Sequence, residues 1–169
     1  MNHNLNNEIK EQLTQAIKEN AWDKLTSLRN NEGDPGSVFY IDSLDLANRD
    51  LGAIPTDFLV FRNCDLSNSS FAGKHFFPMA FWSCKAQNLD LRNTEGMLFA
   101  YRTDLRGAKF DETTQLVVEN SDLPSAFKNC LLDEDFAQFL VSQGALLDFP
   151  RDKHIESYAF GVTDLGNKQ

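Results

Sequence analysis

Apolar residues in the middle of the chain recur every five positions, a period that belongs neither to an α-helix nor to a β-strand. Of the thirteen positions reached by counting in fives from Ile41 to Tyr101, eleven are apolar. The chain is 41% hydrophobic, so roughly five would be expected by chance. After Tyr101 the count slips by one residue and resumes at Leu105 and Phe110, which we attribute to one residue missing at a corner. A fixed internal period predicts a repeat architecture.

The residues before the repeats predict two short helices. One apolar helical stripe consists of Leu5, Ile9, Leu13, Ala16 and Ile17. Asn20 is predicted to be the N-cap of a second helix that begins near Trp22 and ends before a cluster of turn-forming residues at 30–36. We expect this segment, residues 1–36, to cover the first coil of the repeats.

A third helix is predicted after the repeats, near residues 133–143. Asp133 places a carboxylate in its first turn, its apolar stripe contains Phe136 and Leu140, and Gly144 marks its end. We expect the helix to close the far end, within a C-terminal region of residues 116–169 that becomes polar after Pro150. With the repeats at 37–115, the prediction is one folded unit.

Two stretches within the repeats carry a family resemblance. The segments Thr103–Glu112 and Cys64–Gly73, which read TDLRGAKFDE and CDLSNSSFAG, resemble the pentapeptide-repeat family over residues 41–115. The family has a central Leu or Phe that points inward and an inward small residue two positions earlier. Larger residues occupy several small-residue positions here, namely Leu59, Lys74, Met79, Leu89 and Phe99.

The resemblance implies a mainly β fold, a short right-handed four-sided β-solenoid in which residues twenty apart stack on one face. Three inward columns are then chemically consistent: Ile41, Phe61, Phe81 and Tyr101; Leu46, Leu66, Ala86 and Leu105; and Leu51, Phe71, Leu91 and Phe110. The fourth contains Thr56, Phe76, Gly96 and Gln115, so we expect that face to be the least regular.

The net charge and the absence of targeting signals limit the classes of partner and the compartments that we expect. With 16 basic and 25 acidic residues the formal net charge is −9, which argues against binding nucleic acid or an anionic membrane. The sequence contains no run of about eighteen apolar residues and no recognisable signal peptide, so we expect a cytoplasmic protein. We also expect the protein to be a monomer or a weak dimer. Export by a system that needs no cleaved signal stays open as an alternative.

Residues that could carry chemistry are few. Cys64 and Cys84 lie at inward small positions twenty residues apart, where we interpret them as interior residues and leave a redox pair as the alternative. The third thiol, Cys130, and the three histidines do not occur at the spacings that are typical of metal ligands. No catalytic or cofactor motif occurs. The prediction is a non-enzyme without metal or cofactor.

The outward positions give the candidate binding residues. The residue after each inward centre faces solvent, which predicts one outward column of Arg62, Trp82 and Arg102 and another containing Phe77 and Met97. These residue types are enriched at interaction hot spots. The alternative interpretation is that both arginines stack on Trp82, or that a flanking helix covers the other two side chains.

The function predicted from these features is binding of an unassigned protein partner, with use as a bacterial effector one variant of that idea. The resemblance also implies a second class, a topoisomerase inhibitor that imitates duplex DNA. Residues 41–112 contain eight basic and ten acidic residues, a net charge of only −2, whereas residues 113–169 contain four and nine. A DNA mimic needs its negative charge on the solenoid wall, so the binding module is favoured.

Overall fold

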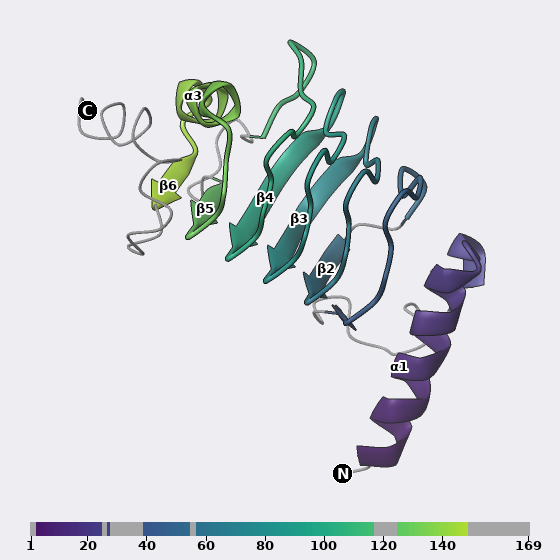
Figure 1. The fold of residues 1–169 in the computed structure, drawn as a ribbon. Helices are drawn as coiled ribbons and strands as arrows, with labels where there is room; N and C mark the ends of the chain where they lie inside the picture. The colour runs from purple at the N-terminus through teal and green to yellow at the C-terminus, as the bar shows by residue number, and fades with distance from the viewer. Residues whose placement is uncertain (1–2, 25–26, 28–38, 55–56, 117–124, 149–169) are drawn as a thin grey trace.

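The solenoid is built on one parallel β-sheet (Figure 1). The computed structural model describes residues 3–24, 27, 39–54, 57–116 and 125–148. Its elements, in chain order, are α1 (His3–Lys18), β1 (Phe39–Asp42), β2 (Asp57–Arg62), β3 (His75–Trp82), β4 (Glu95–Tyr101), β5 (Ala126–Lys128), α3 (Glu134–Ser142) and β6 (Leu146–Asp148). The strands pair in sequence order, each one coil after the last. The mainly β solenoid predicted from the sequence is confirmed, with about five turns.

Backbone pairing recurs at four places around each coil. In the sheet, Phe39 pairs with Leu59 and Leu59 with Met79, steps of twenty residues. Isolated parallel bridges follow three further lines: Asp45, Asp65, Lys85, Asp104 and Leu131; Asp50, Ser70, Asp90 and Lys109; and Glu95 with Gln115. The five-residue period therefore corresponds to one face of a twenty-residue coil.

Contacting aromatic rings fill the centre of the coils. Phe61, Phe71 and Phe81 are fully buried, and the Phe71 ring lies 5.9 Å from Phe61 and 5.7 Å from Phe81 between centroids. Each such side chain contributes roughly 1.5 to 3 kcal/mol of transfer free energy on burial. Because a coil has only four inward centres, few neighbouring side chains can move to fill the space that the loss of one ring would leave.

The corners of the coils depend on residues that tolerate positive φ. Asn48, Asn68 and Asn88 occupy the same corner in three successive coils, with φ of 59°, 58° and 58°. Asn adopts this left-handed conformation more readily than most residues. The Asn88 amide also donates a hydrogen bond to Asn68 Oδ1 at 3.0 Å. Asn at twenty-residue intervals is thus a second sequence signal of the coil, which the five-residue count does not use.

The register slip lies inside the sheet rather than at a corner. Phe76 pairs with Gly96 but Met79 pairs with Leu98, so β4 contains one residue fewer than β3 between these pairs. The longer strand carries Pro78 there, and proline within a sheet is confined to edges and bulges because it lacks an N–H donor. The predicted corner deletion after Tyr101 is therefore wrong.

The slip changes which residues face inward. Phe81 pairs with Ala100, which is buried, whereas the predicted inward residue Tyr101 is half-buried and pairs with Trp82. On the fourth face the twenty-residue step is restored, and Leu116 is buried in place of the predicted Gln115.

Asn20 ends α1 and is not the N-cap of the next helix, although residues 22–24 and 27 are helical, as predicted for a helix that begins near Trp22. Its φ is 54°, its N–H donates to Ile17 O at 3.1 Å, and the Ala21 N–H donates to Ala16 O at 2.8 Å. This pair of bonds is the Schellman arrangement of a helix C-terminus. Ala16 and Ile17 are buried in the core, but the side chains of Leu5, Ile9 and Leu13 lie outside the described residues, as does most of the second helix. Coverage of the first coil by the whole stripe is not shown.

The helix predicted at residues 133–143 is confirmed as α3, followed by Gly144 with φ of 82°. Phe136, Ala137 and Leu140 are buried, and the Phe139 ring stacks on Phe110 at 4.5 Å. The sheet nevertheless continues after α3, since β6 pairs with β5. The sequence did not predict β6, and a closure of the far end by α3 is not shown. The region after Pro150 lies outside the described residues.

Replacement of Phe81 by Ala is expected to lower the free energy of unfolding by about 3 to 5 kcal/mol, since it removes a ring that contacts both Phe61 and Phe71 in the core. Asp65→Ala is the comparison. The Asp65 carboxylate is half-buried and accepts the Ser67 N–H at 2.9 Å, so its loss should cost about 1 kcal/mol or less. Urea unfolding measures both values, and equal losses would contradict the inward register.

Gly96→Ala should destabilise the protein by more than about 3 kcal/mol. Gly96 has φ of 123°, and an added Cβ would lie 2.2 Å from the Phe76 carbonyl oxygen. Gly144→Ala is the matched control, because Gly144 also has positive φ but nothing lies within 4 Å of its Cβ position. The control should cost only about 1 to 2 kcal/mol. A Gly96 variant as stable as the Gly144 variant would refute the close approach.

Candidate functional site

The outer face of the sheet carries two rows of side chains that run across the strands. Successive residues of a strand point to opposite faces, so the strand register fixes which residues share the outer face. The apolar row consists of Tyr40, Val60, Ala80, Phe99, Ala126 and Leu146. The mixed row consists of Asp42, Arg62, Trp82, Tyr101 and Lys128, and continues to Asp148, whose side chain lies outside the described residues.

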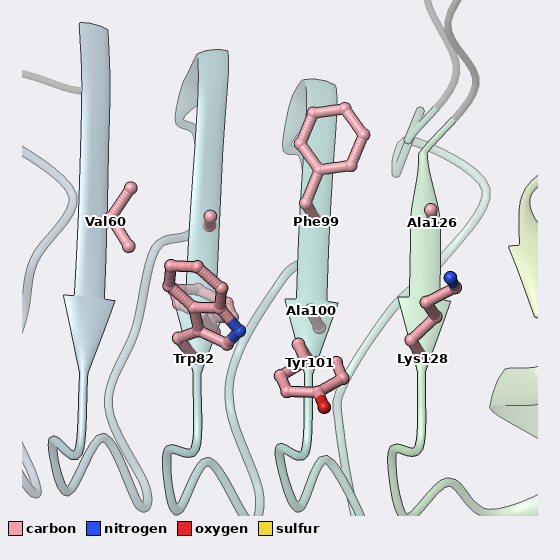
Figure 2. A pocket seen from close by; sticks show the side chains of 9 residues that line it. Val60, Trp82, Phe99, Ala100, Tyr101, Ala126 and Lys128 are labelled. Carbon is pink, nitrogen blue, oxygen red and sulfur yellow. The ribbon is translucent and has the colours of Figure 1, made fainter. Parts of the chain in front are cut away.

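A shallow groove of about 420 Å³ lies between these rows. Figure 2 shows Phe99 on one side of it and Trp82 with Tyr101 on the other, while Lys128 extends alongside Ala126. Ala80 and Ala126 alternate with the larger Val60 and Phe99 in the apolar row, and their small side chains leave the hollow.

Trp82 and Tyr101 form the main wall of the groove. Their ring centroids are 6.2 Å apart at an interplanar angle of 76°, an edge-to-face contact. The Arg102 guanidinium carbon lies 5.1 Å from the Tyr101 centroid, within cation–π range. Trp82 still exposes 43% of its surface, so part of its side chain is accessible to a ligand.

The basic residues near the groove differ in how their charge is compensated. Arg62 donates two hydrogen bonds to the Asp42 carboxylate, at 2.6 and 2.8 Å, and its guanidinium lies 4.3 Å from the Tyr40 centroid. Lys128 is exposed and forms no ion pair within the part of the chain that the structure describes. The rim of the groove nearest the carboxyl ends of the strands therefore carries two cationic side chains, Lys128 and Arg102.

The predicted column of Arg62, Trp82 and Arg102 is wrong in its third member. Arg102 has φ of 49° and lies at the corner, in the position that Asn63 and Ser83 occupy in earlier coils. The slip between β3 and β4 places Tyr101 beside Trp82 instead.

Sequence reasoning consequently missed Tyr101 and Lys128 as lining residues. The neighbouring Pro78 and Gly96 were the available signals of an irregular strand pair. Of the second predicted column, Met97 is half-buried in the bulge, and Phe77 lies in β3 with its side chain outside the described residues.

The three thiols are buried inside the solenoid. Cys64 and Cys84 stand at equivalent inward positions of adjacent coils and donate to the carbonyls of Ile41 and Phe61, both at 3.3 Å. The hydrogen bond with Cys64, together with burial, raises the pKa of Cys84 well above its ordinary value. Burial raises the pKa of Cys130 to about 11.

The thiols of Cys84 and Cys130 are therefore protonated and weakly nucleophilic at neutral pH. In the next coil the Thr103 hydroxyl takes the equivalent place and donates to Phe81 O at 3.3 Å. A hydroxyl in the same role favours the interpretation of these residues as small interior hydrogen-bond donors.

The outer groove is the site that the described geometry defines best.

Over the described parts of the chain, no group of three or more His, Cys, Asp or Glu side chains could hold a metal ion. No helix among the described residues combines the length and apolar character needed to cross a bilayer. Comparison of the chain with protein-family models, with curated proteins and with solved structures finds no match.

Proposed function

We propose that the chain is a non-enzymatic binding module that docks a protein partner on the outer face of its sheet. The observation that carries the proposal is the open apolar groove beside Trp82 and Tyr101. The outer face of a solenoid sheet is open to solvent, and such extended surfaces are the ones that repeat proteins use for binding. Contiguous apolar surface rimmed by polar groups is typical of interaction sites.

We further propose that the solenoid is of the pentapeptide-repeat type. Twenty-residue coils with four lines of backbone pairing support this assignment. So do the buried small residues that stand two positions before some of the buried centres, as in Cys64 with Leu66 and Thr103 with Leu105.

The chemistry of the groove favours a partner with apolar side chains and at least one carboxylate. Trp and Arg are enriched at hot spots, and Trp82 offers a large, rigid and half-open ring. Lys128 supplies a cation at the rim. Two rim cations are too few to hold a phosphate backbone, whose binders neutralise roughly six to ten phosphates.

Trp82→Ala should weaken partner capture at least about tenfold while lowering the free energy of unfolding by only about 1 kcal/mol, the worth of one edge contact. The measurement is affinity capture from bacterial and eukaryotic lysates with quantitative mass spectrometry, beside a melting curve. A large loss of stability would instead assign Trp82 a structural role.

Ala80→Arg gives an independent test because it fills the groove without removing a contact. Ala72→Arg is its matched control, since Ala72 is exposed outside the sheet. Capture should fail for the first variant and persist for the second. A partner captured equally by both variants and by Trp82→Ala would show that the docking face lies elsewhere.

A further inference from the structure

We propose that the outer groove binds a proline-rich segment of a partner protein in the polyproline II conformation, with a carboxylate of that segment beside Lys128. This inference rests on the proposed function and names the kind of segment that docks on the sheet. The segment lies across the strands, along the two rows of side chains that border the groove.

The backbone chemistry of the sheet face suits such a segment. The six strands of the sheet are joined edge to edge, so their outer face offers no backbone partners to an occupant. A polyproline II helix has no internal hydrogen bonds and keeps its backbone in water, and proline has no N–H group that needs an acceptor. A proline-rich segment therefore loses no hydrogen bonds on this face, whereas the N–H groups of an ordinary extended segment would find no acceptor there.

The spacing of the small residues in the apolar row matches the repeat of a polyproline II helix. Ala80 lies on β3 and Ala126 on β5, with the larger Phe99 between them on β4. Two strand spacings separate the alanines, about 9.6 Å. A polyproline II helix has three residues per turn and rises about 3.1 Å per residue, so every third side chain returns to the same edge after about 9.3 Å. Side chains at positions i and i+3 can approach both alanines, while the two residues between them point away from Phe99.

Other conformations fit this spacing less well. A β-strand places side chains on one face about 6.6 Å and 13 Å apart, and neither distance matches the separation of the alanines. A helix brings residues i and i+7 to one face about 10.5 Å apart, but residues i+3 and i+4 share that face and would lie over Phe99. The apolar row therefore favours a polyproline II helix over a strand or an α-helix.

The aromatic wall offers hydrogen-bond donors to the same segment. Among the residues that the structure describes, neither the Trp82 indole N–H nor the Tyr101 hydroxyl forms a hydrogen bond with another group of the protein. Figure 2 shows the indole nitrogen of Trp82 on the side of the ring that faces β4. The carbonyl groups of a polyproline II helix have no internal partners and can accept from both donors. Grooves lined by aromatic side chains are a recurring recognition site for proline-rich segments.

The charge of the groove differs between its two ends. On β2 the Arg62 guanidinium is paired with the Asp42 carboxylate, whereas Lys128 on β5 forms no ion pair within the described part of the chain. Arg102 adds a second cation beside Tyr101. A carboxylate on the occupant is therefore expected near β5, where the proline-rich stretch ends.

An NMR titration of the isotope-labelled full chain with the peptide acetyl-EPPLPPLPPE-amide tests the inference. The two leucines of the peptide are three residues apart, and a glutamate at each end serves either direction of binding. The chain has two tryptophans, so the Trp22→Phe variant assigns the two indole N–H resonances. The peptide should shift the Trp82 resonance in a saturable manner and leave that of Trp22, which does not line the groove, unchanged.

Control peptides separate conformation from composition. Replacing every proline by glycine removes the preformed conformation and should weaken binding at least about tenfold. Replacing every proline by alanine makes the peptide a helix former and should weaken binding by a similar factor, about tenfold. Replacing both glutamates by lysine should also weaken binding, because the groove is cationic near β5.

Variants of the chain place the peptide in the groove. Ala80→Arg should abolish binding, and the exposed Ala72→Arg should not change it. Lys128→Glu should reverse the charge preference, so that the lysine peptide binds more tightly than the glutamate peptide. Melting curves verify that each variant is folded.

Equal affinities for the proline, glycine and alanine peptides would overturn the inference, as would tighter binding of the alanine peptide. So would binding that Ala80→Arg leaves unchanged, a charge preference that Lys128→Glu does not reverse, or no shift of the Trp82 resonance at about 1 mM peptide, the limit of weak specific binding. In each of these cases lysate capture with Trp82→Ala still decides separately whether the groove docks a partner through another kind of segment.

Discussion

Parallel backbone hydrogen bonds between residues one coil apart hold this protein together, and every other feature depends on their regularity. Along one line, Leu46 donates to Asp65 O at 2.8 Å, Leu66 to Lys85 O at 2.6 Å and Ala86 to Asp104 O at 2.8 Å. These bonds require the chain to return to the same place after each coil. The left-handed corners and the small inward residues allow the coil to close within about twenty residues, which brings the buried rings into contact.

The same constraint makes the outer surface sensitive to a single residue. One residue fewer in β4 than in β3 moves the outward side chains in the rest of β4 by one position, because facing alternates along a strand. The bulge thereby places Tyr101 beside Trp82 and turns Arg102 into a corner residue. The groove and its aromatic wall are thus products of the irregularity in an otherwise repetitive fold.

Much of the architecture could be predicted from the sequence because it follows from periodicity. The buried centres Phe61, Phe71 and Phe81 and the helix at α3 are where apolar spacing predicted them. What could not be predicted depended on local backbone chemistry. Asn20 is favoured both as a helix N-cap and at a left-handed C-terminus, and spacing alone could not decide between them. β6 has only three residues, too few for a periodic signal.

The candidate site was harder to predict than the core for a physical reason. Burial favours the same residue types in every coil, whereas outward positions are free to vary and contain no period. Trp82 and Arg62 were identified because they precede the slip, and Arg102 was misplaced because it follows it. A proline such as Pro78 within a predicted strand is a warning that the register with the following strand can change.

The change of register within the sheet creates the aromatic wall of the groove. A nuclear Overhauser spectrum of the Trp82 indole tests it most directly, because cross-peaks require protons within about 5 Å, the range of contacting aromatic edges. We expect strong cross-peaks from the indole to the ring protons of Tyr101, whose centroid is 6.2 Å away. Cross-peaks to the Arg102 side chain with none to the Tyr101 ring would restore the constant twenty-residue register and contradict the account.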